Sequence, residues 1–227
     1  MNLSVIIPAL NEEQSIGYVI KSIPKIYREV IVIDNGSSDR TFEVATQNGA
    51  KVITEKNKGY GFACLKGLDF LKKNPPDIVV FLDGDYSDYP EEIIKIIDPI
   101  YKSDVDFVIG SRVKNSREKG SMTPQQIFGN KLACFLMTLI YKSDFTDLGP
   151  FRAIKWKTLE GLKMSDKTYG WTIEMQLKVL TNSIPYCEVP VRYRKRIGHS
   201  KVSGTLKGTV LAGIKIIGWI FKYYFKK

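Results

Sequence analysis

The stretch DIVVFLDGDYSDYPEE, residues 77–92, carries three structural signals in direct succession. Its apolar run is typical of a strand buried on both faces of a parallel sheet. The acidic turn DGDYSD follows, and Pro90-Glu91-Glu92 then begins a helix, because proline suits the first turn and carboxylates suit the positive helix end. This order of strand, acidic loop and helix predicts one unit of an α/β fold.

The same alternation extends to both sides of this unit. Further apolar runs predict strands at residues 3–8, 29–34, 51–54 and 106–110, beside the one at 77–83. Helical patterns lie near residues 13–23, 39–48, 60–72 and 90–101. Such alternation predicts a mixed, mainly parallel sheet flanked by helices.

The second half of the chain is less regular. Its patterns predict helices at 124–142 and 171–181, a strand at 147–154, an extended segment at 184–194, a loop at 195–205 and a final helix. We therefore expect one domain over residues 1–204, with halves 1–110 and 111–204, followed by a helix over 205–227.

Composition excludes several classes of protein. Among 227 residues, 44% are hydrophobic and 26% are charged, which argues against a disordered or collagen-like chain. Cys64, Cys134 and Cys187 lie far apart, which excludes a cysteine zinc site and a disulfide framework and suits a reducing cytoplasm. We expect neither a signal peptide nor a transmembrane helix, because the apolar stretches are too short.

The net charge of +10 has a definite position. Residues 189–227 contain ten Lys and Arg and no acidic residue, whereas residues 1–188 contain 24 of each sign. A basic end of this kind can meet anionic lipid, a phosphorylated ligand or nucleic acid, or can simply be solvated.

Polar loops follow four of the predicted strands. They are PALNEE (8–13), DNGSSD (34–39), EKNKGYG (55–61) and DGDYSDYP (83–90). Each loop by itself is explained as a turn, because Asp, Asn, Gly and Ser favour turns. Ligands of open α/β sheets bind beyond the carboxyl ends of the strands, so four such loops predict a shared site.

The pair Asp83 and Asp85 is the most specific signal within these loops. Carboxylates at this spacing can hold Mg²⁺ or Mn²⁺ together with phosphate oxygens of a substrate. The chain has no GxGxxG after its first strand and no GxxxxGK[ST], which removes the main support for a dinucleotide dehydrogenase or a P-loop NTPase. The segment at 58–61 either begins a helix that faces a phosphate or is a plain turn.

At this point the sequence resembles a known family. VIIPALNEE, VIDNGSSDRT, NKGYGFACLKGL and FLDGDYSDYPEE, in that order, are similar to the nucleotide-sugar domain of family 2 glycosyltransferases with the GT-A fold. The resemblance continues through FVIGSR (107–112), TDLGPFRAI (146–154), GWTIEMQLK (170–178) and RKRIGHSKVSGT (194–205). These motifs look like the branch of dolichyl-phosphate mannose and glucose synthases and bacterial polyprenyl-phosphate glycosyltransferases.

The resemblance implies a donor site for a nucleotide-diphosphate sugar, UDP- or GDP-linked. Residues implied to bind this donor are Pro8, Ala9, Asn11, Glu12, Asp34, Lys58, Gly61, Asp83, Gly84 and Asp85. Within this set, Asp34 matches the carboxylate that recognises the base or ribose. Asp83 and Asp85 match the DXD pair that binds Mg²⁺ or Mn²⁺ and the diphosphate.

The second half is implied to bind the acceptor. Residues matched to this role are Arg112, Lys131, Arg196, Ser200 and Lys201. The catalytic residues implied are Asp85, Arg112, Asp147, Arg196 and Lys201. Asp147 orients the acceptor or, for a hydroxyl acceptor, acts as general base. We interpret His199 as a variable loop position, and Glu174 as either structural or functional.

One position departs from the pattern of the mannose synthases. Asn130 stands where they carry an arginine used on the acceptor phosphate, with Lys131 beside it. The resemblance implies a polyprenyl-phosphate acceptor, and this departure leaves another lipid or a small-molecule hydroxyl open. A sugar-phosphate nucleotidyltransferase is less favoured, because PALNEE lacks a glycine-rich Arg-Lys loop. A non-catalytic basic module is disfavoured by the DGD pair.

The final helix has its own pattern. At 100° per residue, Lys207, Lys215, Lys222 and Lys226 fall within a sector of roughly 100°. Leu206, Ile217, Ile220 and Tyr224 lie opposite. This predicts a helix in the interface of an anionic membrane at its cytoplasmic face, with packing on the domain's own core as the alternative. We expect no nucleic-acid partner.

Overall fold

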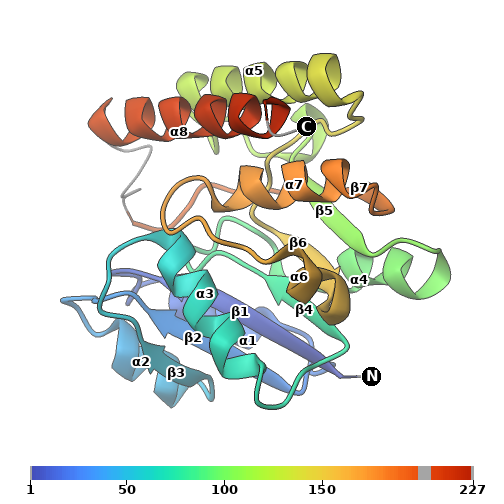
Figure 1. The fold of residues 1–227 in the computed structure, drawn as a ribbon. Helices are drawn as coiled ribbons and strands as arrows, with labels where there is room; N and C mark the ends of the chain where they lie inside the picture. Colours follow the sequence, from blue (N-terminus) through green and yellow to red (C-terminus); the bar gives the residue numbers. More distant parts are fainter. Residues whose placement is uncertain (1, 199–205, 226–227) are drawn as a thin grey trace.

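A seven-stranded sheet forms the centre of the molecule, with helices on both of its faces (Figure 1). The structure is a computed structural model and describes residues 2–198 and 206–225. The strands are β1 (Leu3–Ala9), β2 (Glu29–Asp34), β3 (Lys51–Thr54), β4 (Ile78–Phe81), β5 (Phe107–Ser111), β6 (Arg152–Lys155) and β7 (Tyr186–Pro190). Their order in the sheet is β3-β2-β1-β4-β6-β5-β7.

The α-helices are α1 (Ile16–Ser22), α2 (Thr41–Gln47), α3 (Tyr60–Leu71), α4 (Ile93–Lys102), α5 (Pro124–Tyr141), α6 (Trp156–Leu162), α7 (Trp171–Thr181) and α8 (Leu206–Tyr224). Short 3₁₀ turns occupy Pro90–Glu92 and Lys114–Ser116. Helices α5 and α8 form an outer layer beyond α7, at the top of Figure 1.

The sheet is mixed and mainly parallel, as the sequence predicted. β1 pairs in parallel with β2 and β4, β2 with β3, and β5 with β7. Only β6 runs antiparallel, and it lies between β4 and β5. Because β6 joins the two halves into one sheet, the carboxyl ends of β1, β2 and β4 share an edge with the start of β6.

Both faces of the sheet are buried, which explains the continuous apolar runs. Ile6 and Phe81 point into a core shared with α3, α5 and α7, whereas Val5 and Val80 point into a second core shared with α1 and α4. Alternate residues of one strand therefore belong to different cores. The edge strand β3 is the exception, since Lys51 and Thr54 at its two ends are exposed.

Two details of the second half differ from the prediction. The strand predicted at 147–154 covers only Arg152–Lys155, and residues 147–151 form a loop. Gly149 and Pro150 interrupt the strand, because proline has no N–H for a sheet ladder. Helix α6 follows β6 directly and was not predicted, because its seven residues are too few for a clear helical period.

The final helix α8 packs on the protein along one face. The side chains of Trp219 and Ile220 are 8% and 0% exposed. The Trp219 Nε1–H donates to Asp166 Oδ2 at 2.7 Å, and the Tyr141 hydroxyl of α5 donates to the Ile220 carbonyl at 2.5 Å. The packing alternative therefore holds for this face. No helix of the described residues is long and apolar enough to cross a bilayer.

Candidate functional site

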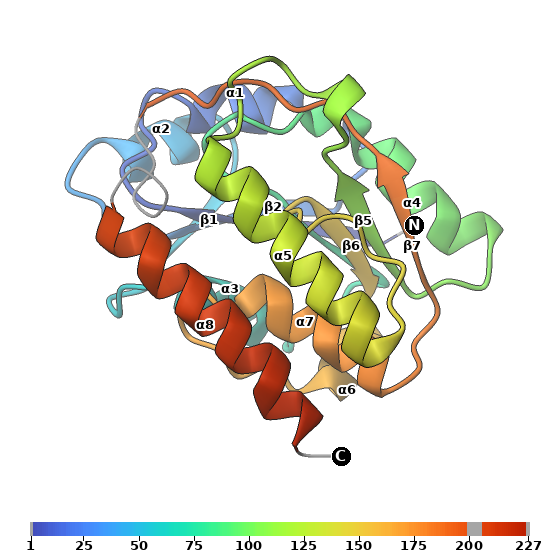
Figure 2. The same ribbon diagram turned by 90° about the horizontal axis from the view of Figure 1, so that it is seen from above.

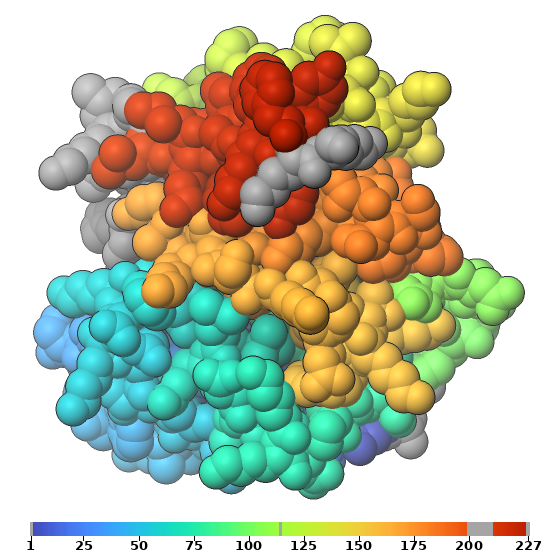
Figure 3. Space-filling model, viewed as in Figure 1, coloured from blue at the N-terminus to red at the C-terminus, as the bar shows by residue number. Residues whose placement is uncertain are grey.

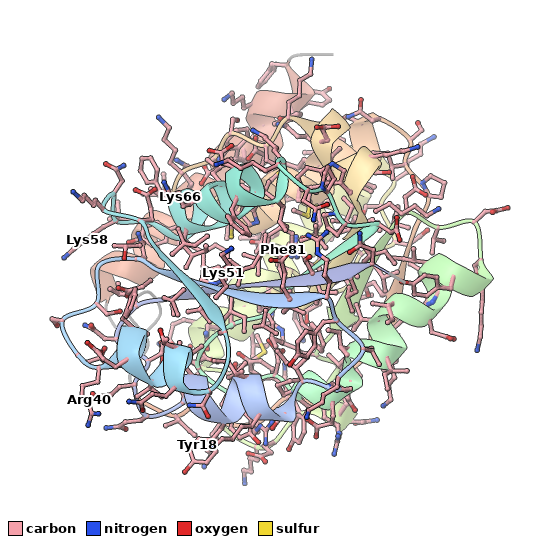
Figure 4. All side chains as sticks on the ribbon, turned by 90° about the horizontal axis from the view of Figure 1, so that it is seen from below. Tyr18, Arg40, Lys51, Lys58, Lys66 and Phe81 are labelled. Atoms are coloured by element: carbon pink, nitrogen blue, oxygen red, sulfur yellow. The ribbon has the colours of Figure 1, made fainter. Side chains whose placement is uncertain are left out.

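Acidic side chains gather at the carboxyl ends of β1, β2 and β4. The ladder pairs Ala9 with Asp34, so the loops after β1 and β2 begin side by side. Asp83 and Asp85 follow β4, the other neighbour of β1. Three of the four polar loops predicted to form one site are thus at the centre of one sheet edge. In Figure 4, seen from below, Phe81 lies inside the molecule, and Lys58, in the remaining loop after β3, projects at its rim.

The two carboxylates after β4 are held by different partners. Asp85 accepts hydrogen bonds from the Ser87 N–H at 2.9 Å and the Ser87 hydroxyl at 2.5 Å. Asp83 accepts one from the Tyr60 hydroxyl at 3.1 Å. Burial, with the charge of Asp85 as the second cause, raises the pKa of Asp83 to about 7. The pair therefore has a strong affinity for added positive charge.

Arg196 supplies positive charge at this place. Its Nη1 lies 3.1 Å from Asp85 Oδ2, and its Nη2 donates to Glu12 Oε1 at 2.8 Å. The Ile197 N–H also donates to the Asp85 carbonyl at 3.0 Å. One guanidinium thus bridges the loops after β1 and β4, although Arg196 and Glu12 are 184 residues apart in the sequence.

Aromatic stacking fixes the segment that carries Arg196. The guanidinium carbon of Arg194 lies 3.6 Å from the ring centroid of Tyr86 and 3.9 Å from that of Tyr89. The Arg194 N–H donates to the Ser87 carbonyl at 2.9 Å. These contacts hold residues 191–198 along the loop after β4. Arg196, two residues beyond Arg194, is thereby kept beside Asp85.

The residues present fit a divalent cation bound together with a diphosphate. Among the described residues, no three His, Cys, Asp or Glu side chains could hold a metal ion by themselves. Asp83 and Asp85 supply hard oxygen ligands, and Mg²⁺ commonly takes one or two carboxylates plus substrate phosphates and water. The guanidinium at Asp85 marks a position where positive charge is already stabilised.

Residues after β2 and β3 build the neighbouring wall. Asp34 is buried and accepts a hydrogen bond from the Ser37 N–H at 3.1 Å. Asn35 donates to the carbonyls of Glu55 and Asn57 and accepts from the Gly59 N–H at 2.7 Å. Asn35 thus holds the loop after β3 against β2. This role could not be predicted from the sequence, because an Asn in DNGSSD is indistinguishable from an ordinary turn residue.

Gly61 and Lys58 take different places in this wall. A Cβ on Gly61 would lie 2.1 Å from the Asp166 carbonyl oxygen, so glycine is required there for close packing. Lys58 is exposed and lies one turn ahead of α3. Pro8, Ala9 and Gly84 are buried at the strand ends and shape the floor of the site.

A hollow opens beside Glu12. Its volume is about 280 Å³, and it is lined by Asn11, Glu12, Glu13, Gln14, Asp39, Ile197 and Gly198. Asn11 has a positive φ of 54° and accepts a hydrogen bond from the Ser38 N–H at 2.8 Å. A larger hollow of about 330 Å³ lies between α3 and α6, away from Asp83 and Asp85, and has Asp69, Lys72, Glu160 and Lys163 in its lining.

Arg112 and Asp147 form a second charged pair at the same sheet edge. Arg112 follows β5, and its Nε and Nη2 donate to the two Asp147 oxygens at 2.8 and 2.7 Å. The Arg112 N–H donates to Asp147 as well, at 2.7 Å. Burial by itself would raise the pKa of Asp147, but the charge and hydrogen bonds of Arg112 lower it below its usual value. Asp147 is therefore a weak base in this arrangement.

The loop that carries Asp147 is held from three sides. Asn130 of α5 accepts from the Leu148 N–H at 2.8 Å and donates to the Thr146 carbonyl at 3.3 Å. Gln176 of α7 donates to the Asp147 carbonyl at 3.0 Å. Asn130, the position that departs from the mannose synthases, thus has a positioning role. The neighbouring Lys131 is exposed on the outer side of α5 and is not brought to this loop.

Glu174 is explained by structure alone. It is fully buried, accepts hydrogen bonds from the N–H groups of Ser165 and Asp166, and pairs with Lys178 at 2.8 Å. It therefore fixes the loop before α7. His199, Ser200 and Lys201 lie outside the described residues, so their predicted roles stay predictions.

Asp88 is a buried carboxylate that the sequence analysis did not single out. It is 1% exposed, and neither side-chain oxygen has a hydrogen-bond partner among the described residues. Burial, followed by the charges of Asp83 and Asp85, raises its pKa well above the usual value. The sequence does not distinguish Asp88 from the other aspartates of DGDYSD. Its burial arises only in the folded protein, where Tyr193 and the rest of the 191–198 segment pack over the loop.

Comparison with known proteins identifies the family. The model of glycosyl transferase family 2 matches residues 4–161, which include the ends of β1, β2 and β4. The chain belongs to glycosyltransferase family 2. The resemblance seen in the sequence is thereby confirmed, and the protein is a glycosyltransferase.

Similar proteins extend the match to nearly the whole chain. A dolichyl-phosphate hexose transferase of Haloferax volcanii is 31% identical, over 92% of this chain and 90% of its own. A UDP-N-acetylglucosamine–dolichyl-phosphate N-acetylglucosaminyltransferase of Methanococcus voltae is 30% identical, over 93% and 92%. An uncharacterised glycosyltransferase of Mycobacterium bovis is 30% identical, over 92% and 94%.

Solved structures confirm the GT-A fold. Glucosyl-3-phosphoglycerate synthase of Mycobacterium tuberculosis, crystallised with Mn²⁺, UDP and glucosyl-3-phosphoglycerate, has a TM-score of 0.79. The sequences are 22% identical, and the match covers 98% of this chain and 79% of that one. A crystal of the same synthase contains Mg²⁺ and UDP. At this identity the likeness concerns the fold.

Proposed function

We propose that this family 2 enzyme transfers a sugar from a UDP- or GDP-sugar to a polyprenyl or dolichyl phosphate, with inversion at the anomeric carbon. The observation that carries the proposal is the meeting of Asp83, Asp85 and Arg196 at the sheet edge where Asp34 also lies. The names of the dolichyl-phosphate relatives support the choice of acceptor.

The donor half of the site follows from the charges. Asp34, with Asn11 and Glu12 beside it, would bind the nucleoside, and Lys58 would lie beside the base. Mg²⁺ or Mn²⁺ held by Asp83 and Asp85 would supply positive charge to the departing nucleoside diphosphate. With such a cation held at Asp85, the Arg196 guanidinium would be available to contact phosphate oxygens instead.

The acceptor half centres on Arg112 and Asp147. Both oxygens of Asp147 are engaged by Arg112, and its pKa is lowered, so this carboxylate is poorly suited to take a proton from a hydroxyl. A phosphate acceptor is already ionised and needs no such base. This geometry favours a phosphate over a hydroxyl acceptor, with Arg112 as the phosphate contact and Asp147 as its positioning residue.

Ser200 and Lys201, with Arg196, would contact phosphate groups of donor and acceptor from the loop at 195–205. A polyprenyl acceptor resides in a bilayer, so the enzyme would work as a peripheral protein at the cytoplasmic face of the membrane. The acid-free end of the chain suits that surface, and nothing in the site calls for a nucleic acid.

A two-stage experiment tests the proposal. Thermal unfolding is first measured with UDP, GDP and their sugars, with and without Mn²⁺; one nucleotide should raise the melting temperature only when Mn²⁺ is present. Transfer from the matching sugar nucleotide is then measured to a short polyprenyl phosphate and to the corresponding free alcohol. Transfer to the phosphate alone is expected. Transfer to the alcohol alone would contradict the proposed acceptor and restore Asp147 as a base.

A further inference from the structure

Helices α5 and α8 lie side by side as the outermost layer of one face of the molecule (Figure 2). Each has an inner face in the core, formed in α5 by Cys134 and Met137 and in α8 by Trp219 and Ile220. The outer faces are apolar as well. In the space-filling view the two helices cover the upper surface of the molecule (Figure 3).

Exposed apolar side chains concentrate on this layer. Among the described residues, fourteen large apolar side chains are exposed, and eight of them lie on α5, on α8 or directly after α8. They are Phe128, Phe135, Leu139, Leu211, Ile214, Phe221, Tyr224 and Phe225. Within each helix their spacings of three, four and seven residues place them in one outward row, and Phe225 follows directly after Tyr224. A contiguous apolar surface of this kind marks an interaction site.

The charged side chains of these two helices have one sign, although an exposed carboxylate, Asp144, lies three residues after α5. Neither helix contains an Asp or Glu. Lys131 and Lys142 are exposed beside the row on α5, and Lys215 and Lys222 follow the edge of the row on α8. Lys215 pairs with Asp166 at 3.1 Å while its side chain stays 41% exposed. A second copy of this face would bring lysines against lysines, whereas an anionic surface would complement them.

We propose that the outer faces of α5 and α8 together form a docking surface for an anionic lipid bilayer. Apolar side chains would enter the headgroup region while the lysines meet acidic headgroups. The inner side of α5 carries Asn130, which holds the loop of Asp147, so docking would place that loop directly beneath the membrane surface. The surface stands on its own observations and does not depend on the donor or acceptor proposed above.

Outward-facing substitutions test the apolar part. The full-length variant Phe135→Ser with Ile214→Ser should bind vesicles of phosphatidylglycerol and phosphatidylcholine on the order of tenfold more weakly than the parent in sedimentation. Phe42→Ser with Ile94→Ser is the matched control and should bind like the parent, because these exposed side chains lie on helices that pack on the other core. Truncation of α8 is unsuitable, because it would uncover the core around Trp219 and Ile220.

Charge substitutions test the electrostatic part. Lys131→Gln with Lys142→Asn should weaken binding roughly thirtyfold at low salt, and the difference should shrink as salt screens the charges. Lys21→Gln with Lys25→Gln, on the opposite side of the sheet, should have no effect. Vesicles of phosphatidylcholine alone should bind the parent more weakly than the acidic ones.

Three results would overturn the docking surface. The folded parent could stay in the supernatant with acidic vesicles, or Phe135→Ser with Ile214→Ser could bind like the parent. Alternatively, sedimentation velocity could find a parent dimer that these substitutions dissociate, which would make the face a contact between copies. Sugar transfer to a detergent-solubilised acceptor separates this test from the proposed function. Phe135→Ser with Ile214→Ser should keep the parent's rate in that assay, because Phe135 and Ile214 lie outside the site. Vesicle binding by a parent that transfers nothing would defeat the proposed function and leave the surface intact.

Discussion

Two arginine–aspartate pairs lie at the same edge of the sheet, and they differ in how completely each partner is used. Arg112 binds both oxygens of Asp147, and the two side chains are 10% and 4% exposed. Arg196 makes a single contact of 3.1 Å with Asp85 and shares its guanidinium with Glu12. The Arg112–Asp147 pair is closed, because both carboxylate oxygens are bound. In the second pair, a cation bound at Asp85 can replace Arg196. We therefore expect Arg196, and not Arg112, to move during the reaction.

Asp85→Asn should produce the largest effect, on the exchangeable pair. Loss of one charge from the DGD loop should reduce transfer roughly thousandfold, as does loss of a group that stabilises a developing charge in other enzymes. Folding should be retained, because the Asn amide can still accept from Ser87. The measurement is initial transfer rate with Mn²⁺, together with urea unfolding. A rate within a few-fold of the parent would remove Asp85 from the metal site.

Arg112→Ala should test whether Asp147 depends on Arg112 alone for its counter-ion. It leaves a buried Asp147 carboxylate without its counter-ion, which should lower the free energy of unfolding by about 3 kcal/mol. The double variant Arg112→Met with Asp147→Leu should recover a substantial part of that loss, because no buried charge remains. Urea unfolding of the three proteins completes the cycle. Equal stability of parent and Arg112→Ala would mean that the carboxylate is satisfied by other groups.

Arg196→Ala should separate function from stability. The side chain is 26% exposed, so unfolding should change by less than about 1 kcal/mol, whereas transfer should fall roughly hundredfold with the loss of a phosphate contact. Without nucleotide, the variant should bind Mn²⁺ more tightly than the parent, because Asp85 no longer has a guanidinium to release. Arg192→Ala, which alters the same segment away from Asp85, is the control for electron paramagnetic resonance titrations of Mn²⁺. Weaker Mn²⁺ binding by Arg196→Ala would contradict an exchangeable pair.

Asp88→Asn should give the smallest effect, on a carboxylate that has no hydrogen-bond partner within residues 2–198 and 206–225. Because burial raises the folded-state pKa of Asp88 above its unfolded value, this group lowers stability as pH rises from about 4 through the raised pKa. The amide should remove that loss and stabilise the protein by about 1 kcal/mol at neutral pH, with little change at low pH. Urea unfolding of both proteins at several pH values measures the difference. Destabilisation at neutral pH would show that the carboxylate is ionised and needed.

The first half of the fold could be predicted well because its signals are local. The runs at 3–8, 29–34 and 51–54 are strands within one residue of the prediction. For the first two the reason is burial on both faces, which leaves few polar residues in the strand. The antiparallel placement of β6 could not be predicted, because four residues carry no information about their partners. The same reason hid α6.

For the site, local pattern is enough to name the residues that are chemically suited to it: Asp83 and Asp85 after an apolar strand, Asp34 after another, and basic residues near the end of the chain. Their partners depend on the folded structure. Arg112 meets Asp147 across 35 residues and Arg196 meets Glu12 across 184, while Asp88 loses its solvent only when residues 191–198 pack over it. It also decided that α8 has two apolar faces, one in the core and one outside. Periodicity reports the spacing of residues along one element, whereas pairing, burial and the charge of a neighbour depend on contacts between elements that are distant in the chain.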